Sequence, residues 1–113
     1  MARADSDADV LRREFEAADG TFLYALQEED RWDRDAFTRL HDALVVCCVG
    51  HGSATTLERW ITSGFWSTLR SIERYLSWQE GLPEEDEEYY HEAHLRVEQA
   101  TEWLLIGCIE RQV

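Results

Sequence analysis

Apolar residues recur along most of the chain with the 3.6-residue period of amphipathic helices, and short polar segments separate the periodic stretches. The pattern predicts helices over about 7–29, 34–49, 54–79 and 83–110. Four amphipathic helices joined by short connections most simply form an up-down-up-down bundle. We therefore expect an all-α fold, a single-domain antiparallel four-helix bundle that spans residues 1–113.

Local signals agree with these boundaries. Gly20 falls on the polar face of the first stretch, where it weakens a helix without ending it. Thr55 and Glu58 have the spacing of a capping box, and Pro83 suits the first turn of the last helix. The run LVVCCV at 44–49 is rich in β-branched residues, but a single strand would have no partner, so we assign it to a helix.

Acidic residues concentrate in two segments, 28–35 and 80–88, which connect the predicted helices. The chain carries 24 acidic and 11 basic residues, all of the latter arginine, for a net charge of −13. The two segments hold eleven acids against Arg31 and Arg34, a net charge of −9. In an up-down bundle both segments lie at the same end, which we call the acidic pole. Its acids are Glu28, Glu29, Asp30, Asp33, Asp35, Glu80, Glu84, Glu85, Asp86, Glu87 and Glu88.

Three explanations of this acidity remain open. A solvated loop needs no partner, and the acids of 84–88 would stabilise the positive end of the last helix dipole. A salt-adapted or GC-rich genome would also favour acids, but would spread them evenly. Glu28 and Glu29 fall at the negative end of the first predicted helix, where acids are unfavourable. The clustering therefore favours a pole that docks on a basic protein surface.

The class of partner follows from the sign of the charge. A strongly acidic chain does not bind nucleic acid directly, since affinity for phosphates comes from basic groups. Basic surfaces are typical of nucleic-acid-binding proteins, so the pole would imitate a phosphate backbone. Small acidic helical proteins of about this size often serve as immunity proteins, antitoxins or anti-CRISPR inhibitors, and the comparison is one of class only.

Several aromatic residues are expected at the partner-binding surface. Trp66 falls opposite the apolar stripe of its helix, with Arg70 one turn away as a possible cation–π partner. Trp32 and Tyr89 lie in the acidic segments, where they would anchor a partner. Three further tryptophans fall at the edges of their stripes and are expected to pack against the core, namely Trp60, Trp78 and Trp103.

The second predicted helix is apolar around most of its circumference near its end. Val45, Val46 and Val49 lie away from the face that carries Leu40 and Leu44. A helix that is apolar all round is normally buried on all sides, so these valines predict a homodimer interface. A central, tilted position of this helix within the monomer is the alternative.

Catalytic and metal-binding signals are weak. The histidines His41, His91 and His94 accompany a single Glu-x-x-His motif that begins at Glu88, whereas di-metal bundles use two such motifs. No nucleophile stands beside a base, and the three cysteines do not form a disulfide pattern, so we read them as buried apolar residues. We expect no enzyme activity, no metal and no cofactor. No leader or membrane segment is expected either, which favours a cytoplasmic protein.

The sequence thus predicts a non-enzymatic acidic protein that inhibits or neutralises a basic, nucleic-acid-binding protein. The alternative is a structural or cofactor-holding helical homodimer whose acidity reflects its host's salt or genome composition.

Overall fold

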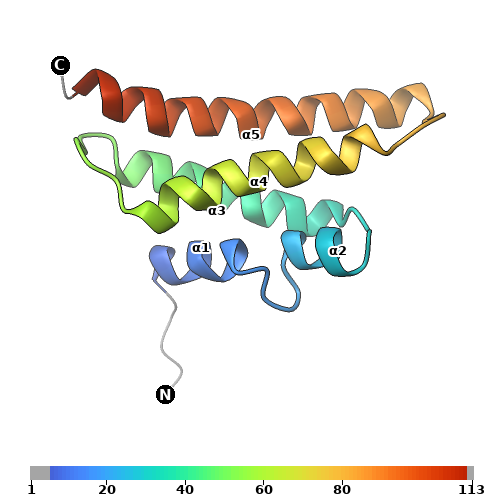
Figure 1. Cartoon of the computed structure of the whole chain (residues 1–113), viewed down its shortest axis with the longest axis horizontal. Helices are drawn as coiled ribbons and strands as arrows, with labels where there is room; N and C mark the ends of the chain where they lie inside the picture. Colours follow the sequence, from blue (N-terminus) through green and yellow to red (C-terminus); the bar gives the residue numbers. More distant parts are fainter. Residues whose placement is uncertain (1–5, 112–113) are drawn as a thin grey trace. The chain divides into compact units, whose positions relative to one another are not determined.

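A computed structural model of the chain describes residues 6–111, which form five α-helices and no strand. The helices are α1 (Asp7–Phe15), α2 (Phe22–Glu28), α3 (Arg34–Gly50), α4 (Arg59–Ser77) and α5 (Glu84–Arg111) (Figure 1). The all-α prediction is confirmed. The chain divides into two compact units, unit 1 (residues 1–52) with α1 to α3 and unit 2 (residues 53–113) with α4 and α5. The single domain and the antiparallel bundle stay predictions.

The predicted helix over 7–29 is wrong as a single element, because the chain leaves the helical conformation after Phe15. Ala17 has φ 55°, in the left-handed region. The N–H of Ala18 donates to the carbonyl of Arg13, and the N–H of Ala17 donates to that of Glu14. This pair of bonds is a Schellman motif, in which the left-handed position is usually glycine.

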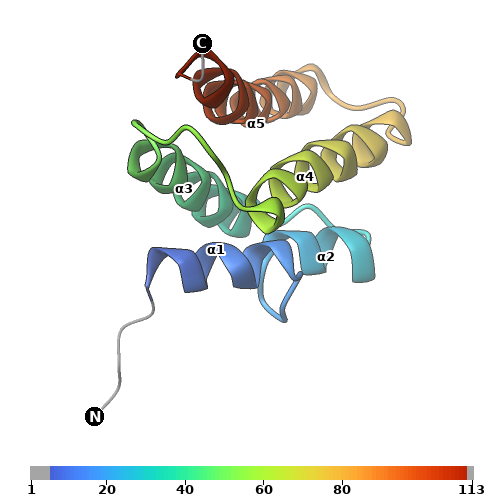
Figure 2. The same ribbon diagram turned by 60° about the vertical axis from the view of Figure 1, so that its left-hand side comes forward.

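Six residues, 16–21, separate α1 from α2 (Figure 2). Gly20 has φ 88°, so it is required by the turn, contrary to the expectation that it only weakens a helix. Thr21 then caps α2, since its hydroxyl accepts from the N–H of Tyr24 and donates to the carbonyl of Ala18. The guanidinium of Arg39 on α3 donates to the Gly20 carbonyl, which ties the turn to α3.

In unit 1, α3 packs against both α1 and α2. The run at 44–49 lies inside α3, so its helical assignment is confirmed. Cys47 and Cys48 are buried, as is Cys108 in unit 2, which confirms the prediction that the cysteines are buried. The largest fully buried side chains of this unit are Phe22, Leu23, Leu40 and Leu44.

In unit 2, α4 and α5 form an antiparallel hairpin (Figure 1). The capping box expected at Thr55 is wrong, since α4 begins at Arg59 after Glu58, whose side chain makes no capping bond. Pro83 precedes α5 by one residue, and its carbonyl accepts from the N–H groups of Asp86 and Glu87. The buried apolar residues of the two helices are Ile61, Phe65, Leu69, Ile72, Ala93, Val97, Ala100, Leu104 and Cys108. No helix of the described residues has the length and apolar character that a bilayer crossing requires.

Candidate functional site

The acidic segment of unit 1 joins α2 to α3 and contains its own arginine. Asp30 follows the C-cap of α2 with φ 49°, a left-handed conformation that aspartate tolerates. The guanidinium of Arg31 lies 3.0 Å from a Glu29 oxygen and 3.5 Å from an Asp33 oxygen. Asp33 caps α3, and the N–H of Ala36 that donates to its carboxylate lowers the pKa of Asp33. Part of this acidity therefore serves the local fold.

Glu28 is not accounted for in this way. It is the last residue of α2, it is exposed, and in the described part of the chain it forms no ion pair. An acid at the C-terminal end of a helix faces the negative end of the dipole. Asp35 is also exposed but lies in the first turn of α3, where the dipole favours it. Glu28 is thus the acid of this segment for which the fold gives no reason.

Trp32 packs within unit 1 rather than extending from it. Its ring centroid lies 4.8 Å from that of Phe22, in a T-shaped contact, and 5.3 Å from that of Phe37, in a stacked one. The side chain is half-buried. Trp32 therefore fixes the α2–α3 connection against the core, and its role as a partner anchor stays a prediction.

The acidic segment of unit 2 forms the N-terminal turns of α5. Asp86 is half-buried, whereas Glu84, Glu85, Glu87 and Glu88 are exposed and, among residues 6–111, form no ion pair. Tyr89 follows them, and its ring lies 5.4 Å from that of Tyr90. The Tyr90 ring in turn contacts that of Tyr75 on α4, at 6.4 Å. The acids thus stand beside a half-buried aromatic cluster that fixes this end of the hairpin.

The residues assigned to the acidic pole belong to different units. Segment 28–35 lies in unit 1, from the end of α2 into the start of α3, and segment 80–88 lies in unit 2, from the connection after α4 into the start of α5. A single pole that joins both segments stays a prediction.

The exposure of Trp66 is confirmed, with 56% of the residue accessible. The Arg70 guanidinium carbon lies 6.0 Å from the centre of the Trp66 ring, as the cation–π interpretation expects. The assignment of Trp78 and Trp103 to the core is wrong, since they are 79% and 48% exposed. Trp60 is half-buried, and its indole N–H donates to Glu58.

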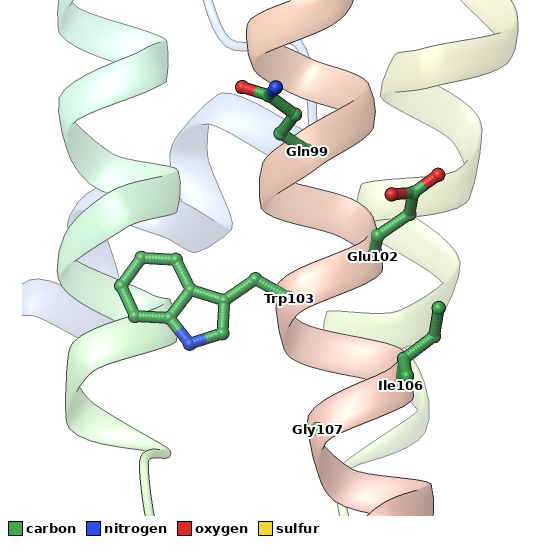
Figure 3. A pocket seen from close by; sticks show the side chains of 5 residues that line it. All are labelled: Gln99, Glu102, Trp103, Ile106 and Gly107. Carbon is green, nitrogen blue, oxygen red and sulfur yellow. The ribbon is translucent and has the colours of Figure 1, made fainter.

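An exposed apolar face on α5 was missed from the sequence. Trp103 and Ile106, each 48% exposed, line a shallow depression of about 340 Å³ together with Gln99, Glu102 and Gly107 (Figure 3). All five residues belong to α5, so the depression lies along one helix. Its signal in the sequence is the i, i+3, i+4 spacing of 99, 102, 103, 106 and 107, which lies beside the buried stripe.

The valines expected at a dimer interface are unevenly exposed. Val46 and Val49 are 44% and 64% exposed on α3, and Val45 is half-buried. The first two are therefore the apolar surface that a second subunit could cover, and the interface itself stays a prediction.

A buried carboxyl group lies beside a hollow of about 230 Å³ in unit 1. Glu14 is 6% exposed, and its Oε2 has no hydrogen-bond partner. Burial raises the pKa of Glu14, while Arg39, Arg13 and the N–H of Phe22 lower it by smaller amounts. Because Oε2 itself is inaccessible, the group acts on the stability of unit 1 and offers little to a ligand in the hollow.

The ligand-forming residues are arranged differently from the sequence motif. Glu88 and His91 are exposed on α5, whereas the His94 Nε2 lies 3.2 Å from a carboxylate oxygen of Glu73 on α4. Glu98, one turn beyond His94, completes a group whose ligand atoms lie within 4.8 Å of one another. The thiols of Cys47 and Cys48 are poor nucleophiles, since burial raises the pKa of both, that of Cys48 to about 12.

Comparison of the chain with protein-family models, with curated proteins and with solved structures found no match.

Proposed function

We propose that this protein is a non-enzymatic acidic binding protein that inhibits or neutralises a basic, nucleic-acid-binding protein by imitating a phosphate backbone. The observation that carries the proposal is the run of acids at the start of α5, four of which are exposed and form no ion pair in the described part of the chain. The proposal includes a cytoplasmic location. It also includes the antiparallel bundle expected from the sequence, which would bring segments 28–35 and 80–88 to one end.

The charge density of this run supports mimicry. Residues 84–88 are five successive acids, and at roughly 1.5 Å per residue they extend about 6 Å along the helix axis. The run thus carries about one negative charge per 1.5 Å, against about one per 1.7 Å along duplex DNA. A surface that binds phosphates through arginine and lysine would meet a similar field here.

The dipole of α5 explains only part of this run. Acids in the first turn of a helix gain about 0.3–1 kcal/mol each, and the effect fades within that turn. Glu88 lies beyond the first turn of α5, and Glu28 lies at the wrong end of α2. Acidic residues at positions where the helix dipole does not favour them support a role in binding a partner rather than in stabilising the fold.

The test begins with capture of bound proteins from the source organism, followed by purification of each candidate and surface plasmon resonance against two charge-reversed variants. One variant changes to lysine Glu28, Glu29, Glu85 and Asp86. The matched control changes to lysine four exposed acids elsewhere, Glu16, Asp42, Glu92 and Glu102.

We expect the first variant to lower the association rate constant by about tenfold or more, since steering accelerates association by 10–10³. The control should lower it less, and added salt should reduce the wild-type rate towards that of the first variant. Duplex DNA should displace this protein from its partner. Equal effects of the two variants, or a partner that DNA does not displace, would contradict the proposal.

A second candidate function is a structural or cofactor-holding homodimer whose acidity reflects salt or genome composition. The exposure of Val46 and Val49 on α3 favours it, because two large apolar side chains one turn apart form a patch suited to a subunit contact.

A further inference from the structure

The polar contact between α4 and α5 is more than an isolated ion pair. Glu73 extends from α4, while His94 and Glu98 lie one turn apart on the same face of α5. The Nε2 of His94 lies 3.2 Å from an oxygen of Glu73, and the three ligand atoms lie within 4.8 Å of one another. A histidine–glutamate pair alone would not need the second carboxylate.

We infer that Glu73, His94 and Glu98 form a binding site for a divalent transition-metal ion of the zinc class, a site beyond the proposed function. Two carboxylates at this separation repel each other, and no arginine forms an ion pair with either within the described residues. A bound cation relieves that repulsion.

The spacing suits such an ion. With bonds of about 2.1 Å, two ligand atoms in a tetrahedral zinc site stand about 3.4 Å apart. The distance between His94 and Glu73 is already close to this value, and Glu98 needs a side-chain adjustment on the order of 1 Å to complete the triangle. The imidazole favours zinc-like ions over calcium or magnesium, which prefer oxygen ligands.

The three ligands would leave at least one coordination position for water. The side chains of Glu73 and His94 are 41% and 27% exposed, so solvent reaches the site. Because the ligands come from both helices, a bound ion would join α4 to α5 and stabilise the hairpin. The sequence showed only the Glu88–His91 motif, from which we expected no metal. The position of Glu73 beside His94 changes that expectation.

The experiment uses the full chain, reduced and without a histidine tag, titrated with Co²⁺ while the absorption of the ion is followed. We expect one equivalent to bind, with visible ligand-field bands and without the intense near-ultraviolet band of cobalt–thiolate bonds. Replacement of a ligand in E73Q, H94A or E98Q should weaken binding by at least tenfold, since even outer-shell changes cost about 10–100-fold. The matched control is H91A, which removes an exposed histidine of the same helix and should bind as the wild type does.

Thermal unfolding with Zn²⁺ provides a second measurement. Zn²⁺ should raise the Tm of the wild type and of H91A and leave those of E73Q and E98Q unchanged. E73Q alters an exposed side chain, so its circular dichroism should equal that of the wild type. Failure to bind Co²⁺, a thiolate band, equal binding by H94A and the wild type, or equal losses in H91A and H94A would each overturn the inference.

Discussion

Replacement of Gly20 by alanine should change the free energy of unfolding in opposite directions for the observed fold and for a continuous first helix. Inside a helix, Gly→Ala stabilises a protein by about 0.5–1 kcal/mol. Gly20 instead has φ 88°, and a Cβ built there has no atom within 4 Å, so no steric clash adds to the backbone strain. The left-handed conformation costs an alanine roughly 1–2 kcal/mol, offset by about 0.4–1 kcal/mol from the restricted unfolded chain. We expect G20A to lower the free energy of unfolding by about 1 kcal/mol.

Urea denaturation followed by far-ultraviolet circular dichroism measures this change. With an m-value of about 2 kcal/mol/M, a loss of 1 kcal/mol lowers the midpoint by roughly 0.5 M. G50A is the control, since Gly50 ends α3 without a positive φ and also has no atom near its Cβ. It should be neutral or stabilising by up to about 1 kcal/mol. A17G should stabilise by about 1 kcal/mol, because it supplies the residue that the Schellman motif favours. A G20A midpoint above that of the wild type would refute this account of the turn.

Three further predictions concern burial. Because burial raises the pKa of Glu14, the folded state binds the proton of this carboxyl group more tightly than the unfolded state does. The contribution of Glu14 to stability is therefore greatest below pH 4.5 and falls as pH rises through the raised pKa. E14Q should flatten the measured dependence of the unfolding free energy on pH. If Val46 and Val49 form a subunit contact, V46E with V49E should give a folded monomer in sedimentation, and a monomeric wild type would contradict the homodimer. W66A should lower the free energy of unfolding, measured by chemical denaturation, by about 1 kcal/mol or less. F65A, which truncates a fully buried neighbour, should lower it by about 3–5 kcal/mol. Equal losses in the two variants would contradict the helical phase of α4.

The sequence predicted the helical stripes better than the helix ends. An apolar period indicates which residues are buried, and Leu11, Phe22 and Leu26, which follow that period in the predicted helix over 7–29, are indeed buried. It does not report that the chain leaves the helix between them, because α1 and α2 both pack against α3. The usual sign of such a break is a glycine at the left-handed position. Alanine holds that position here, at Ala17, so the signal was absent.

The candidate sites were less predictable, because they depend on packing register. The outward direction of Trp66 follows from helical phase alone and was confirmed. Trp78 is the C-cap of α4, where the stripe no longer determines burial, and its predicted packing was wrong. Glu73 could be paired with His94 only once the alignment of α4 against α5 was known. No local motif encodes that alignment.

The distribution of buried cysteines gives the chain a built-in probe of cooperativity. Cys47 and Cys48 lie in unit 1 and Cys108 in unit 2, and each is buried in the folded protein. A thiol reagent can modify such a side chain only when the surrounding structure opens, so its rate of labelling follows the local opening free energy. Equal opening free energies at Cys48 and Cys108 under native conditions would identify a single cooperative transition, and unequal ones would identify two. The sulfur atoms that serve as apolar packing in the native state thus record whether the two units open together or one at a time.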